Sequence, residues 1–382
     1  MSEAQTAARW DGALVTSALI LTGIGMVMNY STTAALEIGT VLPPLALRHT
    51  GGVAFALLCG AAAARLPLIA WERVALWLWA GTLALLAATL LFGIEANGAR
   101  RWLAIPGLPF SVQAAEPARL ATLLAVVTVV ARATPRGLAS LALLQRVALL
   151  VVPPVALLLL QPDFGSAVLL CAMVGLVLFA AGLPVRTLFL PAIVAMAGGA
   201  LYIALNAYAR ARVRGFFDPW QNAHAEGFQL VQSFVAFGRG GSTGVGLGNG
   251  RQKLFYLPEA HTDFILSVVA EELGLVGVLI VIGAFAALCW AGLRVARAAR
   301  EPFPLLLATA ATGLVVIPAL CNAAVVTGLV PTTGLTLPFL SHGSNSLVCT
   351  AVAVGILLRV AAESGATSRR GRGASRLARE RP

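Results

Sequence analysis

Long apolar runs separated by short polar segments dominate this sequence. About ten of the runs are roughly 20 residues long, which is enough to cross about 30 Å of hydrocarbon as an α-helix. Their expected positions are residues 13–31, 47–65, 73–93, 114–132, 143–160, 165–183, 187–208, 262–290, 303–329 and 340–361. The pattern therefore predicts an all-α polytopic membrane protein with about ten transmembrane helices.

The polar segments between these runs are short, with one exception. Residues 209–261 form a long loop between the seventh and eighth predicted spans, and long loops in otherwise compact chains often carry function. Residues 1–363 are expected to form the membrane domain. Residues 364–382 are polar and rich in arginine, cannot bury a core, and are expected to form a disordered cytoplasmic tail.

The distribution of charge orients the predicted spans. The chain carries 27 basic and 16 acidic residues, a net charge of +11, and most basic residues fall in segments that would share one side with both termini. The positive-inside rule then places both termini in the cytoplasm. All four histidines and most acids fall on the other side, so a reaction site is expected at the outer face. This placement argues against a nucleic-acid partner and a nucleotide cofactor.

The stretch Leu257–Gly274 concentrates acidic residues at the beginning of the eighth predicted span. Acids at a membrane boundary are costly to desolvate. Asp263 is the leading candidate for a general base, although a carboxylate in the first helical turn is also typical of a cap that complements the helix dipole. Glu271 and Glu272 lie deeper and are expected to be hydrogen-bonded inside the bundle, while the role of Glu259 is open.

Further candidates follow in other outer segments. Arg101 and Trp102 suit an anionic, sugar-bearing ligand, or else anchor the chain at the depth of the lipid headgroups. Glu116 and Arg119 share a helix face, either as a structural pair or as the lining of a polar cavity. Asp163 is interpreted as a cap of the sixth span or as a second carboxylate of the site.

Two glycine-containing segments complete the outer side. Gly244–Gly250, with the sequence GVGLGNG, superficially resembles a phosphate-binding loop, but no strand precedes it and it faces outward, so it is a weak nucleotide motif. Lys253 follows it. Val330–Leu347 interrupts the helical pattern with proline and glycine and supplies Ser341 and Ser346. Irregular polar backbone at this depth requires burial in protein or a wet cavity.

Together these motifs resemble the SEDS family of peptidoglycan glycosyltransferases (shape, elongation, division and sporulation). The resemblance covers residues from about 10 to 362. It rests on NGARRW, QPDFG, DPW, GVGLGNG, LPEAHTDF followed by EELG, and PTTGLTLPF followed by serine, in family order. The residues of the motifs LPEAHTDF and PTTGLTLP are more similar to those of the division members of the family than to those of the elongation members.

The resemblance implies an enzyme of the bacterial plasma (inner) membrane that polymerises lipid II at the outer face and at the division septum. It implies a class B penicillin-binding transpeptidase and other division proteins as partners. Asp263 matches the essential acid of the family. Arg48, Arg119 and Lys253 would hold phosphates, with or without a divalent cation such as Mg²⁺ or Mn²⁺. The expected substrate-binding residues are Arg48, Arg101, Trp102, Glu116, Arg119, Asp163, Lys253, His261, Ser341 and Ser346.

The chain also departs from the family pattern. Arg119 stands where the family usually has lysine, Pro117 is unusual at its position, and Ser341-His342-Gly343-Ser344-Asn345-Ser346 replaces S-Y-G-G-S-S. These departures keep open a non-catalytic scaffold for the transpeptidase. A lipid II flippase is the other alternative, because many spans with buried charges also suit a transporter.

Overall fold

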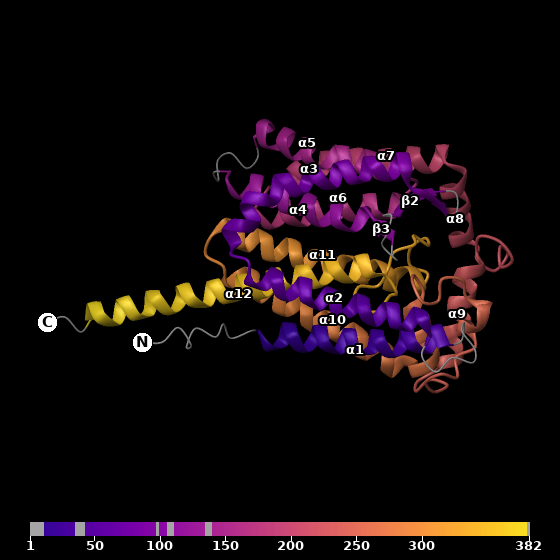
Figure 1. The fold of residues 1–382 in the computed structure, drawn as a ribbon. Helices are drawn as coiled ribbons and strands as arrows, with labels where there is room; N and C mark the ends of the chain where they lie inside the picture. Colours follow the sequence, from indigo (N-terminus) through magenta and orange to yellow (C-terminus); the bar gives the residue numbers. More distant parts are fainter. Residues whose placement is uncertain (1–10, 35–42, 97–98, 105–110, 134–139, 380–382) are drawn as a thin grey trace.

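The structure is a computed structural model that describes residues 11–34, 43–96, 99–104, 111–133 and 140–379. Long helices make up most of this part of the chain and lie roughly parallel in one bundle (Figure 1). They are α1 (Gly12–Ala34), α2 (Pro44–Arg65), α3 (Leu68–Phe92), α4 (Ala115–Ala131), α5 (Leu141–Leu160), α6 (Phe164–Ala180), α7 (Val185–Leu205), α10 (Ile265–Ala298), α11 (Pro302–Val326) and α12 (Ser344–Arg379).

The prediction of an all-α polytopic membrane protein is confirmed. Among the described helices, eight are long and apolar enough to cross a bilayer, and α6 is a shorter apolar helix. Helix α1 begins and helix α12 ends at the same end of the bundle (Figure 1), as the charge distribution predicts. We call that end the inner end and the opposite one the outer end.

Smaller elements gather at the outer end. An antiparallel sheet, which the sequence did not lead us to expect, follows α3; its strands are β1 (Ile94–Ala96), β2 (Ala99–Ala104) and β3 (Ser111–Gln113), in the order β1-β2-β3. The long loop contains α8 (Ala207–Phe217), α9 (Phe228–Gly240) and the π-helix η3 (Gln252–Tyr256). In Figure 1, α8 and α9 lie across the outer end of the bundle.

The helices pack closely where side chains are small. A Cβ atom on Gly355 of α12 would lie only 2.2 Å from the carbonyl oxygen of Gly60 in α2, so neither helix tolerates a larger residue at this crossing. At the other extreme, α7 has no buried residue. It lies at the periphery of the bundle, where its apolar side chains are left to the surrounding lipid.

Prolines inside helices leave carbonyl groups that other residues must satisfy. Pro154 in α5 has no N–H to donate to the carbonyl of Leu150. The indole Nε1 of Trp79 in α3 donates to that oxygen instead, at 2.9 Å. This hydrogen bond ties α3 to α5 within the membrane, where an unpaired carbonyl would be costly.

Helix α10 is interrupted at Gly274, which has a φ of +67°. A Cβ atom there would lie 2.3 Å from the backbone nitrogen of Gly244, so the position requires glycine for its conformation and for the close approach. The N–H groups of Leu275 and Val276 donate to the carbonyls of Gly241 (3.0 Å) and Ser242 (3.2 Å). The break thus attaches the long outer loop to α10.

Ion pairs connect the helices near the inner end. Arg132, the residue that follows α4, pairs with Glu72 of α3 at 2.9 Å, and Arg294 of α10 pairs with Asp11, just before α1. These groups are largely exposed on the arginine side. Helix α12 continues to Arg379 and projects beyond the bundle (Figure 1).

Candidate active site at the outer end of the bundle

Two irregular segments hold Asp263 in place at the outer end. One precedes α10 and the other, residues 330–343, joins α11 to α12. The buried side chain of Asn322 in α11 donates from Nδ2 to the carbonyls of both Asp263 and Leu335, each at 2.7 Å. The Ser341 hydroxyl donates to the carbonyl of Thr262 at 2.6 Å. The two segments therefore form one unit around Asp263.

The Asp263 carboxylate itself is not engaged as a cap. Helix α10 begins at Ile265 without a side-chain cap, and in the described part of the chain no hydrogen bond reaches the Asp263 carboxylate oxygens. The pKa of this carboxyl is raised to about 7, mainly by burial and also by the nearby Glu259 carboxylate, while Arg212 and Arg101 oppose the rise. The group can therefore exchange a proton near neutral pH, as a general base must.

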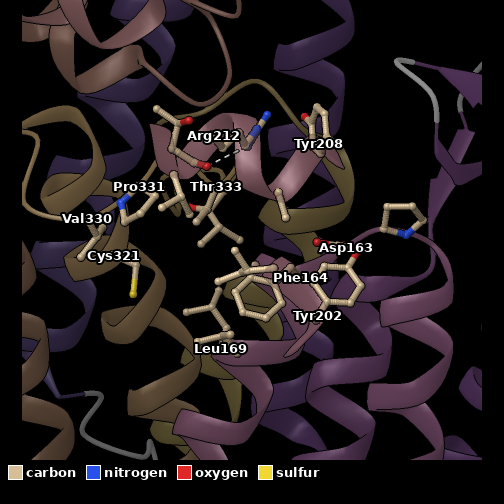
Figure 2. Close-up of a pocket in the computed structure, with 18 of the residues that line it drawn as sticks. Asp163, Phe164, Leu169, Tyr202, Tyr208, Arg212, Cys321, Val330, Pro331 and Thr333 are labelled. Carbon is tan, nitrogen blue, oxygen red and sulfur yellow. Dashed lines mark hydrogen bonds between the residues drawn. The ribbon is translucent and has the colours of Figure 1, made fainter. Parts of the chain in front are cut away.

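An apolar cavity of about 270 Å³ lies beside this unit. Figure 2 shows it between α6, α7, α8 and the segment 330–335. Most of its wall is apolar, including Phe164, Leu169 and Leu335, and its charged lining residues are Arg101, Asp163 and Arg212.

Gly334 connects the cavity to Asp263. It lies between two residues that line the cavity, and a Cβ atom on it would be 3.4 Å from Oδ2 of Asp263 and 4.0 Å from Nη1 of Arg212. The carboxylate and the guanidinium thus face the same point at the edge of the cavity.

Two predicted residues, Arg101 and Asp163, meet in this cavity. Arg101 comes from β2 and donates from Nε to the carbonyl of Gln161 (3.2 Å) and also to that of Pro162. Asp163 is buried and caps α6 by accepting from the N–H of Ser166 at 3.2 Å. The cap predicted for Asp163 is therefore present, and the same carboxyl also lines the cavity.

Sequence reasoning did not single out Arg212. It lies on α8, donates to the carbonyl of Thr332 at 2.8 Å, and its guanidinium carbon is 4.8 Å from the centre of the Tyr208 ring. The spacing of four residues between Tyr208 and Arg212 places both on one helix face. The neighbours Arg210 and Arg214 have the same sequence character, so the sequence alone does not distinguish the one that faces the cavity.

Glu116 and Arg119 form a buried ion pair at the start of α4. They line a second, much smaller cavity together with Thr336 and Ser346. The Thr336 hydroxyl donates to the Ser346 hydroxyl at 3.1 Å. This pair does not line the larger cavity; it supports residues 335–338 from within the bundle.

Three histidines from three segments cluster near the outer end of α2, with His49 and His342 stacked and His261 edge-on to His342. The ring of His342 lies 5.3 Å from that of His49 and 5.8 Å from that of His261, measured between centroids. Burial lowers the pKa of both His261 and His342, so both are neutral at neutral pH. Arg48 lies beside this stack with an exposed side chain. The described residues contain no group of three or more His, Cys, Asp or Glu arranged to hold a metal ion.

The environment of Lys253 differs from the expected one. Its ammonium is buried, lies 2.6 Å from Oε1 of Glu272 and donates to the Ser31 hydroxyl at 2.7 Å. A phosphate contact through Lys253 would require breaking this buried pair, which is costly. Trp102, in contrast, is half-buried on β2, opposite Gln113 of β3.

The glycine-rich loop also has an internal partner. The N–H of Gly248 donates to Glu272 at 3.0 Å, and the N–H groups of Arg251 and Gln252 donate to the two carboxylate oxygens of Glu271, both at 3.0 Å. The prediction that Glu271 and Glu272 are hydrogen-bonded inside the bundle is confirmed. The loop resembles an anion-binding loop because it binds the protein's own carboxylates.

A carboxyl group with a raised pKa, beside an apolar cavity at the outer end of a membrane bundle, defines a membrane-embedded site for an amphiphilic substrate. Comparison with known proteins identifies the protein family. Residues 12–366 match the family described as cell cycle protein, FTSW_RODA_SPOVE. The chain belongs to this family, the one expected from its motifs, and is therefore a multi-pass bacterial membrane protein.

Individual relatives cover nearly the whole chain. It is 41% identical to the probable peptidoglycan glycosyltransferase FtsW of Halomonas elongata, over 94% of this chain and 92% of the relative. It is 39% identical to the protein of the same name from Geobacter metallireducens, over 92% and 94%.

Solved structures agree with these relatives. One chain, from a structure described as "Structural coordination of polymerization and crosslinking by a peptidoglycan synthase complex", is 30% identical with a TM-score of 0.78, over 93% of this chain and 98% of that one. The rod shape determining protein RodA of Thermus thermophilus is 28% identical with a TM-score of 0.68, over 93% and 97%.

Proposed function

We propose that the protein is a peptidoglycan glycosyltransferase that polymerises lipid II into glycan strands at the outer face of the plasma membrane during septal wall synthesis. The observation that carries this proposal is the position of Asp263: its carboxyl has a pKa near 7 and faces the edge of an apolar cavity. The names of the relatives support the reaction, and their division role supports the septum as its location.

In the proposed reaction, Asp263 accepts the proton of the 4-hydroxyl of the acceptor sugar. The hydroxyl oxygen forms a bond to the anomeric carbon of the donor, and the bond from that carbon to the pyrophosphate oxygen breaks. The electron pair leaves with the polyprenyl pyrophosphate, and the configuration at the carbon inverts. The proton on Asp263 then passes to water, which a carboxyl with a pKa near neutrality allows.

The remaining predicted residues take two roles in this proposal. Arg101 and Asp163 line the cavity directly, while Arg48, Trp102 and His261 lie at the outer end, where the sugars would be. The buried pairs Glu116–Arg119 and Glu272–Lys253, with Ser341 and Ser346, hold the irregular segments in position.

A divalent cation, Mg²⁺ or Mn²⁺, is compatible with the reaction. Because the described side chains do not form a ligand group of three or more residues, pyrophosphate oxygens would supply most of its ligands. Its chemistry would be to neutralise charge on the leaving pyrophosphate.

The proposed partners are a class B penicillin-binding transpeptidase and further division proteins. The similarity to a chain from a solved peptidoglycan synthase complex supports the first of them. A polymerase at the outer membrane surface produces uncrosslinked strands, so a crosslinking enzyme beside it would receive the product directly.

The decisive experiment measures polymer formation from labelled lipid II by the purified protein with its transpeptidase partner. Asp263→Asn should reduce the rate by at least about 100-fold, because a general base contributes about 10²–10⁴. Glu226→Gln, which changes an exposed acid of the same outer loop, is the matched control and should leave the rate unchanged.

The alternatives give other outcomes in the same preparation. Appreciable polymer from folded Asp263→Asn protein would remove Asp263 from the role of base. Movement of labelled lipid II across vesicle membranes without polymer would favour the flippase. Neither activity in a folded protein bound to its partner would favour the scaffold.

A further inference from the structure

The cavity beside Asp263 combines an apolar wall with two arginines, Arg101 and Arg212, and one carboxylate, Asp163. Arg101 and Arg212 both line it (Figure 2 shows Arg212 above the cavity, on α8). Among the described residues neither guanidinium forms an ion pair with a carboxylate. The buried cations elsewhere behave differently: Arg119 pairs with Glu116, and Lys253 pairs with Glu272.

Both guanidinium groups are fixed in place by backbone carbonyls. Arg101 donates to the carbonyls of Gln161 and Pro162 at the end of α5. Arg212 donates to that of Thr332 and lies over the ring of Tyr208. These contacts use part of the five N–H donors of each side chain. Asp163 lines the same cavity, so two cations face one lining carboxylate there and a net positive charge remains. An unpaired charge at an apolar wall is unfavourable, so an anion is expected to bind there.

The surroundings specify the kind of anion. The wall is apolar, and the cavity of about 270 Å³ is small for a ligand site, since such sites typically measure about 300–1,000 Å³. A phosphate group and the first units of a hydrocarbon chain would occupy it. On the α7 side, where no residue is buried, the rest of a long chain would continue into the bilayer.

The position of Arg212 relative to Asp263 identifies which phosphate this is. Both groups face Gly334 from within 4.0 Å of the Cβ that it lacks. A base at that point acts beside the anomeric carbon of the donor, and this carbon carries the pyrophosphate. The phosphate nearest the base is therefore that of the donor lipid, which becomes the leaving group.

We propose that Arg101 and Arg212 form a phosphate clamp that binds the pyrophosphate of the donor polyprenyl lipid, with the beginning of its chain in the apolar cavity. This assignment rests on the proposed function for the identity of the lipid. It replaces Arg119 and Lys253 as phosphate ligands, because those two cations are already neutralised by glutamates.

The test measures binding rather than turnover. Purified protein in lipid nanodiscs is titrated with undecaprenyl pyrophosphate and with undecaprenol, which lacks the phosphates. Arg212→Gln and Arg101→Gln should each weaken pyrophosphate binding by about 10- to 100-fold, the usual effect of losing a charged hydrogen bond, and leave binding of the alcohol unchanged. Arg212→Lys should show a smaller loss, because lysine keeps the charge without the planar fork.

Arg210→Gln is the matched control, since Arg210 lies on the same helix with an exposed side chain. It should bind the pyrophosphate within about twofold of the native protein, because single exposed charges contribute little. Equal affinities of Arg212→Gln and Arg210→Gln would overturn the clamp, as would an equal loss of the pyrophosphate and the alcohol. If Arg212→Gln unfolds, the affinities of Arg212→Lys and Arg210→Lys for undecaprenyl pyrophosphate are compared instead. Equal affinities of these two variants would likewise overturn the clamp.

One further variant separates this proposal from the proposed function. Asp263→Asn should bind undecaprenyl pyrophosphate at least as tightly as the native protein, because it removes a negative charge next to the clamp. Loss of polymerisation together with retained binding supports both proposals. If the native protein binds the pyrophosphate through the two arginines but makes no polymer, the phosphate clamp is supported and the proposed glycosyltransferase activity is contradicted.

Discussion

At the scale of single residues, the Asp263 carboxyl lies under opposing electrostatic influences. Burial and the Glu259 carboxylate favour its neutral form, whereas Arg212 and Arg101 favour the charged form. Glu259 holds a left-handed backbone conformation with a φ of +57°, and its exposed side chain accepts a hydrogen bond from Thr262 at 2.8 Å. Glu259, whose role the sequence left open, therefore helps to set the basicity of Asp263.

This balance predicts the pH dependence of the reaction. A base with a pKa of about 7 is mostly protonated at pH 6, so the rate of polymerisation should rise with pH through 7 and fall by about tenfold per unit well below it. Glu259→Gln removes a negative neighbour, lowers the pKa of Asp263, and should move the profile to lower pH. Initial rates from labelled lipid II between pH 5.5 and 8.5 provide the measurement. A flat profile, or the same profile for both proteins, would contradict it.

The sequence predicted some of these residues and missed others for physical reasons. Asp263 stands in a motif at the beginning of an apolar run, and both features can be recognised directly in the sequence. Arg212 and Lys253 are both basic residues of the long loop. Only the fold shows that Lys253 meets Glu272, 19 residues away, while Arg212 forms no ion pair with a carboxylate in the described part of the chain. Charge pairing across turns is a property of three-dimensional packing, so the sequence alone does not show which cations of this loop are already neutralised.

At the scale of elements, the outer loop and α10 function as one unit. The glycine loop donates backbone N–H groups to Glu271 and Glu272, and the break at Gly274 accommodates the loop's backbone against the helix. Lys253 at the beginning of η3 completes the connection to Ser31 of α1. This unit leads directly into the turn that carries Asp263.

The Lys253–Glu272 pair is expected to stabilise the protein rather than to bind substrate. Lys253→Met leaves a buried carboxylate without its cation and should lower the free energy of unfolding by about 3–5 kcal/mol. The double variant Lys253→Met/Glu272→Gln removes both charges and should recover much of this loss. Thermal unfolding in detergent measures both, with Arg251→Gln, exposed in the same loop, as the control. Unchanged stability together with weaker undecaprenyl pyrophosphate binding would instead support the phosphate role first expected for Lys253.

Hydropathy predicts the long helices well because each must satisfy its own backbone within the membrane. Their ends are shifted by a few residues: the run expected at 13–31 is α1, Gly12–Ala34. The sheet β1-β2-β3 escaped prediction because its strands have at most six residues and pair only with one another. The break in α10 escaped it as well, since a glycine inside an apolar run gives no sign of a positive φ.

At the scale of the whole molecule, the candidate site and the arginine-rich segments lie at opposite ends of the bundle. The cavity, the carboxyl groups of the site and the three clustered histidines lie at the outer end, where a lipid-linked sugar would be found. The inner end carries arginines and the helical extension of α12 (Figure 1). The peripheral α7, held to α6 through the stacked rings of Phe164 and Tyr202, forms the side of the cavity next to the lipid.

The ion pairs of the inner end and the Lys253–Glu272 pair of the outer loop differ in their exposure to water, and this gives these two regions different sensitivity to ionic strength. At the inner end the side chain of Arg132 is 63% exposed and that of Arg294 is 47% exposed, whereas that of Lys253 at the outer end is 4% exposed. In 1 M salt the Debye length is only about 3 Å, so exposed pairs are screened while buried pairs are not.

Raising NaCl from 0.1 to 1 M should therefore speed amide hydrogen exchange at the inner ends of α1 and α4 and leave residues 241–256 unchanged. Equal changes at both ends would contradict this difference. At high ionic strength residues 241–256 would then stay rigid, while the inner ends of α1 and α4 become the more compliant part of the bundle.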